Sequence, residues 1–233
     1  MKLEICANSY QSALNAQKAG ADRIELCSEL SVGGITPSYG VLKKVSKKIT
    51  IPVHVLIRPR SGDFCYSDTD FEVMKKDIKT CVKLGFKGIV SGVLNTDNTI
   101  DKARTKELIE ASKPLSFTFH RAFDCLIHPK MAIEELIDLK VDRVLTSGKQ
   151  EKAIDGIALL KELQKLAKDA LIIIPGSGIN TTNALFFKNE KFKEIHTSAS
   201  KITANSKVFF DKTRQTVSDT ITIQEILKAI KNV

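Results

Sequence analysis

The sequence lacks several features that would assign a chain to a particular class of protein. No apolar run approaches the roughly 20 residues that cross a membrane, so a transmembrane segment is excluded. Five cysteines in 233 residues are too few and too scattered for a disulfide framework, and their odd number leaves at least one thiol unpaired. Residues 1–5 contain no apolar targeting core and already have the pattern of a strand. We therefore expect a cytoplasmic protein with reduced thiols.

A concentrated basic segment is also absent, although the formal net charge is +9. The lysines are spread through helix-like segments and are mixed with acidic residues, as in Met74–Lys75–Lys76–Asp77. Nucleic-acid binding favours Lys and Arg gathered on one face or in one arm. The distribution therefore predicts a solvated basic surface that attracts small anions, and no nucleic-acid partner.

The composition, with 42% hydrophobic and 27% charged residues, is ordinary for a soluble globular protein. We expect one domain over residues 1–233, because strand-like and helix-like segments alternate without a break in composition. The clearest helix places Phe71, Met74, Ile78 and Val82 on one stripe. The strand-like runs are Leu3–Ala7, Arg23–Cys27, Val53–Ile57, Gly88–Ser91, Leu115–His120, Arg143–Thr146, Leu171–Ile174 and Glu194–Thr197.

Eight strand–helix units predict an α/β fold, the TIM (β/α)8 barrel, with an open doubly wound sheet as the alternative. The last βα unit is irregular, because a polar stretch over residues 200–222 precedes a short amphipathic segment, Ile223–Ile230. A lid, an interface and a loose segment all fit that polar stretch.

Strand side chains alternate between two faces, so the runs predict which residues face the barrel interior. In Glu4–Ile5–Cys6 and Glu25–Leu26–Cys27, the carboxylates and thiols share one face. A purely structural parallel strand is usually apolar on both faces. Because a desolvated charge is costly, we expect Glu4 or Glu25 to pair with Arg58 or to shift in pKa. The expected interior contains Glu4, Cys6, Glu25, Cys27, His54, Arg58, Thr118, His120 and His196.

Several longer motifs carry a resemblance to a known family: ADRIELC at 21–27, GGITPSYG at 33–40, IRPRSGDFCYSD at 57–68, FHRAFD at 119–124, VLTSG at 144–148 and PGSGI at 175–179. They resemble the CutC family, named for copper homeostasis, from the first strand to about residue 200. The resemblance implies a cytoplasmic TIM-barrel protein, sometimes dimeric, that binds copper(I) through cysteines matching Cys6 and Cys27. Soft thiolates favour copper(I), which agrees with that implication.

Other candidate residues lie at the strand ends, where the loops of a TIM barrel form the active face. Glu4, Glu25 and His120 are the candidates for general acid or base catalysis. For each histidine, a hydrogen-bonded structural role is the alternative.

A set of anion-binding candidates occupies the same strand ends. Arginine side chains can hold a carboxylate or phosphate through two hydrogen bonds, and small residues after a strand can direct backbone N–H groups at an anion. Structural alternatives are an arginine that neutralises an interior glutamate and a glycine loop that is only a tight turn. The set comprises Arg58, Arg60, Arg121, Ser147, Gly176, Ser177, Gly178, His196 and Ser198.

Two functions from different classes fit these residues. One is a copper homeostasis protein that binds copper(I) through Cys6 and Cys27 at the barrel mouth. The alternative is a TIM-barrel enzyme that acts on a small anionic or phosphorylated compound, although no lysine is predicted at an inward strand end, which argues against a Schiff-base aldolase. A scaffold protein is a third possibility, and a symmetric homodimer is the default assembly.

Overall fold

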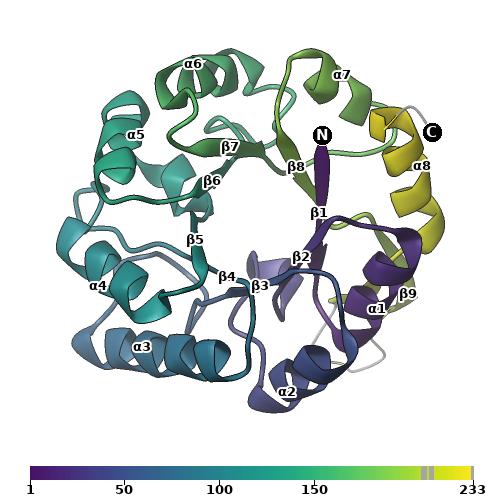
Figure 1. The fold of residues 1–233 in the computed structure, drawn as a ribbon, viewed down its shortest axis with the longest axis horizontal. Coiled ribbons are helices and arrows are strands. Elements are labelled where there is room, and N and C mark those ends of the chain that lie inside the picture. The colour runs from purple at the N-terminus through teal and green to yellow at the C-terminus, as the bar shows by residue number, and fades with distance from the viewer. Residues whose placement is uncertain (206–208, 210–212, 232–233) are drawn as a thin grey trace.

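A computed structural model describes residues 1–205, 209 and 213–231 of the chain. Eight parallel strands form a nearly closed barrel with helices packed around it (Figure 1). The predicted TIM-like (β/α)8 barrel is therefore confirmed. The strands are β1 (Lys2–Ala7), β2 (Arg23–Leu26), β3 (Val53–Leu56), β4 (Gly88–Ser91), β5 (Ser116–Phe119), β6 (Arg143–Thr146), β7 (Ile172–Pro175) and β8 (Glu194–Thr197).

Strand order excludes the doubly wound alternative. Neighbouring strands follow the chain from β1 to β7, with β8 beside β1, and show no reversal of the kind that a doubly wound sheet requires. The circle closes between β7 and β8, where Gly176 forms an isolated parallel bridge with His196. In the register of β1, Glu4 lies beside Arg23 on one side and His196 on the other. This register places a carboxylate between two basic side chains.

Helices cover the outside of the barrel. Serine residues begin several of them; Ser67 forms a capping box with Asp70 at the start of the third helix, satisfying backbone N–H groups that the helix leaves free. The helices are α1 (Tyr10–Ala19), α2 (Tyr39–Lys48), α3 (Asp68–Lys83), α4 (Lys102–Ser112), α5 (Pro129–Asp138), α6 (Ile157–Ala167), α7 (Ala184–Asn189) and α8 (Thr220–Lys231), with short 3-10 helices η1 (Leu30–Val32) and η2 (Arg121–Cys125) near the strand ends.

The main apolar core lies between the strands and the helices. Phe71, Met74 and Ile78 of α3 are buried in it, as their spacing predicts. A second, much smaller cluster contains Cys6, Cys27, Leu56 and Val90. The outward faces of the strands thus supply most of the hydrophobic stabilisation, which leaves polar residues on the inward faces.

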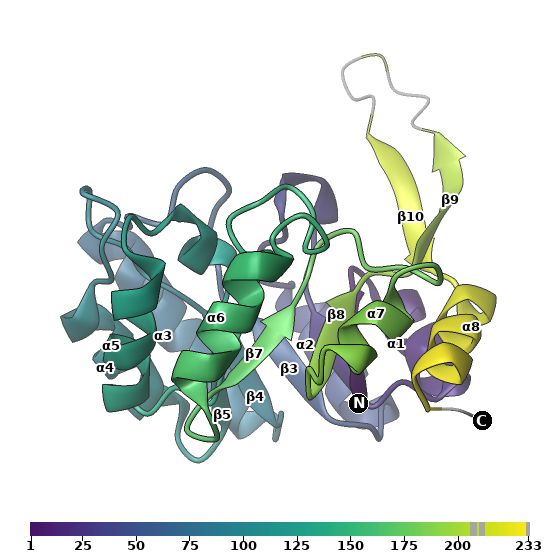
Figure 2. The same cartoon turned by 90° about the horizontal axis from the view of Figure 1, so that it is seen from above.

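The irregular last unit contains an antiparallel hairpin, β9 (Ser200–Asn205) and β10 (Arg214–Ser218), within the predicted polar stretch. Figure 2 shows this hairpin projecting beyond the barrel at the end where the strands finish. The Asn8 side chain donates to the backbone oxygen of Thr216, and Asn15 donates to that of Ser218, so the base of the hairpin is attached to α1 and the loop before it. Residues 206–208 and 210–212 of the stretch lie outside the described residues.

The amphipathic C-terminal segment is helix α8, which begins at Thr220 rather than at the predicted Ile223. Ile223, Ile226 and Ile230 form its buried face. Among the helices that the structure describes, none has both the length and the apolarity to cross a membrane.

Candidate functional site

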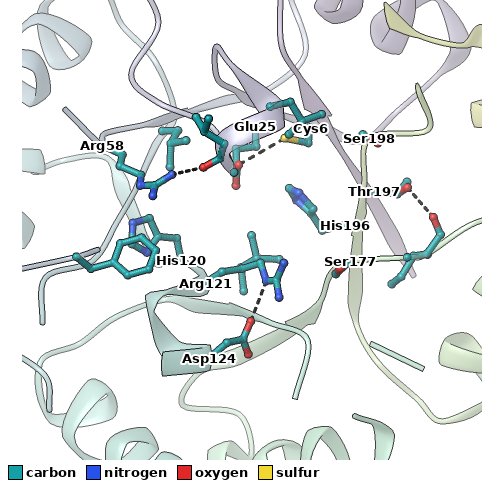
Figure 3. Close-up of a pocket in the computed structure, with 18 of the residues that line it drawn as sticks. Cys6, Glu25, Arg58, His120, Arg121, Asp124, Ser177, His196, Thr197 and Ser198 are labelled. Atoms are coloured by element: carbon teal, nitrogen blue, oxygen red, sulfur yellow. Dashed lines mark hydrogen bonds and ion pairs between the residues drawn. The ribbon is translucent and has the colours of Figure 1, made fainter. Parts of the chain in front are cut away.

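A cavity of about 550 Å³ lies at the carboxyl ends of the strands, with walls from strand ends and from η1 and η2 (Figure 3). Its volume is in the range of small-molecule sites. Most of the predicted site residues meet here. Those on the wall are Cys6, Glu25, Arg58, His120, Arg121, Ser177, Gly178, His196 and Ser198, whereas Glu4, Cys27, Arg60, Ser147 and Gly176 do not line the cavity.

Cys6 lies in a cluster of side chains that could hold a metal ion. The ligand atoms of Cys6, Glu25 and His196 are all within 4.8 Å of one another, and all three residues are buried. Strand pairing accounts for this arrangement, because Cys6 of β1 is the register partner of Glu25 of β2. Cys6 Sγ lies 3.7 Å from Glu25 Oε1. We call these three residues the Cys6 cluster.

Cys27 lies behind Cys6, with 3.6 Å between the two sulfur atoms. It is fully buried beneath Gly34. Gly34 has a φ of +88°, and a Cβ atom there would lie 3.3 Å from Cys27 Cβ and 2.7 Å from Leu56 Cδ2. Only glycine fits this backbone conformation and this close approach. The hydrogen bond to Cys27 and burial raise the pKa of Cys6 well above its usual value, so its thiol is protonated at neutral pH.

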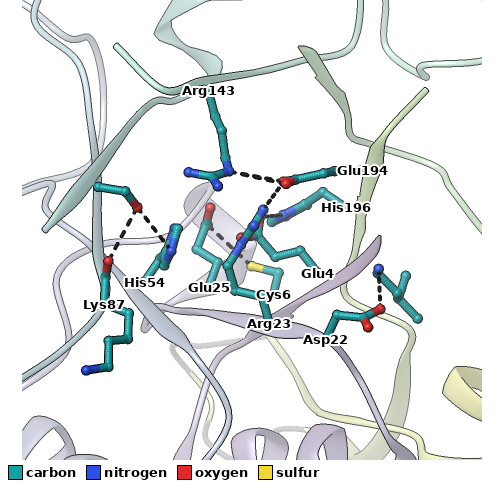
Figure 4. Close-up of polar contacts among 12 residues, drawn as sticks. Glu4, Cys6, Asp22, Arg23, Glu25, His54, Lys87, Arg143, Glu194 and His196 are labelled. Carbon is teal, nitrogen blue, oxygen red and sulfur yellow. Dashed lines mark hydrogen bonds and ion pairs between the residues drawn. The ribbon is translucent and has the colours of Figure 1, made fainter. Parts of the chain in front are cut away.

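A buried ion network lies deeper in the barrel than the Cys6 cluster (Figure 4). The Arg23 guanidinium donates hydrogen bonds to Glu4 and Glu194. Arg143 Nε donates to Glu194 Oε2 at 3.2 Å, and His196 Nδ1 lies 2.8 Å from Glu4 Oε1. Because β8 contributes both Glu194, at its start, and His196, the network connects the end of the barrel where the strands begin to the Cys6 cluster.

Of the two outcomes expected for an interior glutamate, pairing with Arg58 or a shift in pKa, the structure shows the shift and no pairing with Arg58. Glu4 pairs with Arg23, its register partner on β2, rather than with Arg58 beyond the end of β3. The expected shifts in pKa are present. Burial would raise the pKa of Glu4, but Arg23 and His196 outweigh burial and hold it well below its usual range.

Glu25 and His196 share the cavity wall and have raised pKa values for different reasons. Burial raises the pKa of Glu25 to about 7, although the nearby His196 acts in the opposite direction. Burial would lower the pKa of His196, but Glu25 and Glu4 outweigh it, so the net shift is upward. The two carboxylates thus favour positive charge on the His196 ring in this part of the cavity wall.

Arg58 lies on another part of the wall and holds two loops together. Its Nη1 donates to the backbone oxygens of Val32, at 2.8 Å, and Gly34, at 2.9 Å. Its Nη2 donates to the backbone oxygen of Gly62 at 2.7 Å. Arg60, by contrast, does not line the cavity; it pairs with Asp63 and Asp70 and donates to backbone oxygens of the loop over residues 61–65.

His120 is a neutral imidazole close to Arg58. Burial, with a smaller contribution from the Arg58 charge, lowers the pKa of His120 to about 3. Its Nδ1 accepts a hydrogen bond from the backbone N–H of Ala122 at 3.2 Å, so the single proton of the neutral ring lies on Nε2. The ring contacts Phe64, with 4.9 Å between the centroids. His120 therefore acts as a hydrogen-bond donor rather than as a charged group.

Arg121 pairs with Asp124, which also accepts hydrogen bonds from the loop after β6. Its Nε donates to Asp124 at 2.8 Å and its Nη2 donates to Ser147 Oγ at 3.0 Å. The Asp124 carboxylate accepts hydrogen bonds from the Thr146 hydroxyl and from the backbone N–H groups of Ser147 and Lys149. Ser147 thus supports the wall from behind.

The glycine loop after β7 lines the cavity with Ser177 and Gly178. Ser177 Oγ donates to the backbone oxygen of Glu151 at 2.6 Å, which engages the hydroxyl within the protein. Ser177 and Gly178 have φ angles of +84° and +70°, and a non-glycine residue in this region stores backbone strain. Gly176 packs so closely that a Cβ would lie 2.5 Å from Leu145 Cδ1.

Several residues of the site escaped sequence reasoning. Arg23 carried a usable signal, because it shares the alternating face of Glu25. Arg143 and Glu194 are likewise the first residues of strands, and the alternation of side chains along those strands predicts that both face inward. Phe64 of the cavity wall lies in a loop and Leu30 begins the three-residue helix η1, and neither segment is long enough for a periodic pattern to indicate the direction of a side chain.

Comparison with known proteins identifies relatives along most of the chain. A model of the CutC family matches residues 1–201. A CutC family protein of Yersinia pestis (strain Pestoides F) is 49% identical over 201 residues, which cover 86% of this chain and 79% of that protein. A CutC family protein of Photorhabdus laumondii is 48% identical over 201 residues, covering 86% and 81% of the two chains.

Solved structures agree with this relationship. A crystal structure of CutC from Streptococcus agalactiae, named as a candidate copper homeostasis protein, is 34% identical and has a TM-score of 0.81 over 85% of this chain and 98% of that one. An aldolase at 13% identity has a TM-score of 0.63, covering 85% of this chain and 90% of that one. A thiamine phosphate pyrophosphorylase of Pyrococcus furiosus at 11% identity has a TM-score of 0.62, covering 99% and 96%. The last two show a shared fold alone.

Proposed function

The chain belongs to the CutC family, whose name denotes copper homeostasis, and from that membership we propose that it binds copper(I) at the barrel mouth. One observation carries this function: the ligand atoms of Cys6, Glu25 and His196 converge within 4.8 Å on the wall of an accessible cavity. Thiolate, imidazole and carboxylate are all metal ligands in proteins.

The condition of each side chain supports metal binding. Glu25 Oε2 is buried and has no hydrogen-bond partner among the described residues, so a cation would satisfy an acceptor that is otherwise costly to bury. His196 Nδ1 is held by Glu4, which leaves Nε2 as the nitrogen available to a metal. A carboxylate behind a ligating histidine is the usual arrangement that orients the ring and increases its basicity.

The second thiol favours copper(I) over harder cations. Soft thiolate ligands select copper(I) among biological metals, and Cys27 Sγ lies only 3.6 Å from Cys6 Sγ. Because burial and the neighbouring thiol keep Cys6 protonated, the metal must displace a proton when it binds. In this proposed site Cys6 lies between the other candidate ligands. Cys27 is on its buried side, and Glu25 and His196 are on its cavity side.

Anaerobic titration of the reduced, metal-free protein with copper(I), against a competing chelator, tests this function. We expect one copper(I) per chain, with affinity at least about 100-fold weaker in Cys6→Ser, since a lost ligand should cost no less than a lost outer partner. Cys27→Ser and His196→Gln test the other ligands. Cys125→Ser is the matched control, because Cys125 is an exposed thiol on the same cavity wall but lies outside the cluster. Unchanged affinity in Cys6→Ser would refute the site.

A further inference from the structure

Arg58 is a buried cation without a counter-ion in the described part of the chain. The residue is 5% exposed, and its guanidinium donates to three backbone carbonyl groups, those of Val32, Gly34 and Gly62. None of the ion pairs among the described residues includes it; its Nε has no hydrogen-bond partner of ordinary geometry there, and the nearby Tyr66 hydroxyl is neutral because burial raises its pKa to about 12. Buried charges in proteins are normally paired, because carbonyl dipoles alone replace water poorly. An anion is therefore the missing partner.

A second donor without a partner lies beside Arg58. His120 is 4% exposed, and its Nε2 has no partner among the residues that the structure describes. Since Nδ1 is the acceptor for Ala122 N–H, Nε2 carries the proton and can only donate. Phe64 lies against both groups, with its ring 4.9 Å from Arg58 Cζ and 4.9 Å from the His120 ring.

We propose that the wall formed by Arg58, Phe64 and His120 binds a small organic oxyanion, either a carboxylate or a phosphate monoester. Two donors and no acceptor match the oxygen atoms of such a group, and a charge-assisted hydrogen bond to Arg58 would satisfy the buried cation. All three residues line the cavity of about 550 Å³, far larger than the roughly 30 Å³ that one water molecule occupies. The cavity leaves room for an organic body on the oxyanion, which the Phe64 ring can contact.

This wall is separate from the Cys6 cluster and does not depend on metal binding. No residue is shared between the two sets, and the carboxylates near Cys6 would repel an anion from that end of the cavity. Arg121 contributes less to an anion, because Asp124 already pairs with it. Anion binding should consequently persist in Cys6→Ser protein, so the two functions can fail independently.

NMR of the 15N-labelled, metal-free Cys6→Ser protein tests the wall. Malonate and methyl phosphate are the probes, added at constant ionic strength so that screening does not change. We expect the Arg58 Nε–H and His120 Nε2–H resonances to shift together and saturate at millimolar probe. Saturation with malonate alone identifies a carboxylate, and saturation with methyl phosphate alone identifies a phosphate. If neither probe shifts these resonances in folded protein, the wall binds no oxyanion.

Variants separate this site from general attraction to a basic surface. Arg58→Gln should weaken binding of the effective probe at least 10-fold. Arg214→Gln, which removes an exposed guanidinium on β10 outside the cavity wall, should leave binding unchanged. Equal binding by Arg58→Gln and the parent protein would overturn the assignment. If Arg58→Gln does not fold because the loops at Val32 and Gly62 lose their anchor, the Arg58 and His120 resonances of the parent protein still decide the question.

Discussion

Replacing Arg23 with methionine tests whether the buried ion network stabilises the barrel interior. The Arg23 side chain is 5% exposed and lies between Glu4 and Glu194, which are 2% and 3% exposed. Removing one partner of a buried ion pair costs about 3–5 kcal/mol, because a charge is left uncompensated. Glu194 retains Arg143 and Glu4 retains His196. We therefore expect a loss of about 3–5 kcal/mol rather than twice that amount.

Urea denaturation at pH 7, followed by circular dichroism, measures this loss as a lower midpoint at an unchanged m-value. Lys193→Met is the control, because the Lys193 side chain is 57% exposed and its pair with Asp169 is screened by water. Surface pairs of this kind contribute about 0–1 kcal/mol. A loss below about 1 kcal/mol for Arg23→Met would show that the buried glutamates do not need Arg23 to compensate their charge.

The same variant has a pH signature with a definite sign. In the wild-type protein, Arg23 and His196 outweigh burial and hold the pKa of Glu4 well below its usual value of 4.5. Without Arg23, burial has more effect and the folded-state pKa of Glu4 rises. This rise removes stability that the ionised Glu4 contributes at higher pH in the wild-type protein, so the deficit of Arg23→Met should be largest near pH 7 and smaller at acidic pH. A deficit that grows on acidification contradicts this reasoning.

Two further substitutions test particular packing environments. Burial lowers the pKa of His54 from 6.5 to about 3. As the pH drops through this range, the unfolded chain takes up a proton before the folded protein does, so the free energy of unfolding falls. His54→Gln should therefore reduce the slope of this free energy against pH by about 1.4 kcal/mol per pH unit. An unchanged slope in urea titrations would contradict a neutral buried imidazole. Gly34→Ala, with a φ of +88° and a Cβ 2.7 Å from Leu56 Cδ2, should cost about 1–3 kcal/mol in thermal denaturation. Gly40→Ala, where a Cβ would lie 3.9 Å from the nearest atom, should not lower the stability. Equal losses in the two variants would refute the packing explanation.

Local periodicity was sufficient to predict the barrel and most inward-facing residues. Alternation in the first strand assigned Glu4 and Cys6 to one face, and both are buried on the inner side of the barrel. Strand ends were less predictable, since β2 ends at Leu26 rather than Cys27 and β3 ends at Leu56 rather than Ile57. End positions depend on which carbonyl groups find partners in neighbouring strands, and alternation contains no information about those partners.

The pairing within the barrel could not be predicted in the same way. Alternation identifies the face of each strand, but the height of a side chain along the barrel axis depends on the stagger between strands. Glu4 and Arg58 face inward at different heights, so Glu4 pairs with Arg23 in its own layer. The register of β1 with β2, which no single strand encodes, decides the ion pair.

The hairpin of β9 and β10 was missed for a different reason. A two-stranded hairpin that projects from the barrel has little buried face, as the exposed side chains of Arg214 and Gln215 illustrate. Without a buried face, the sequence has no period of two in hydrophobicity. Residues 200–222 therefore had the pattern of a polar connection, although strands occur within them.

The pKa values of two histidines on the wall of one cavity shift in opposite directions, because the charged groups around the two rings differ. Glu25 and Glu4 raise the pKa of His196 against the effect of burial. At His120, burial and the Arg58 charge act together and lower the pKa to about 3. A cation is therefore favoured where the carboxylates lie and repelled by Arg58, whereas an anion meets donors at Arg58 and His120. Glu4, Glu25 and His196 lie on strands, whereas Arg58 and His120 follow strand ends, so we expect ligands of opposite charge to favour different walls.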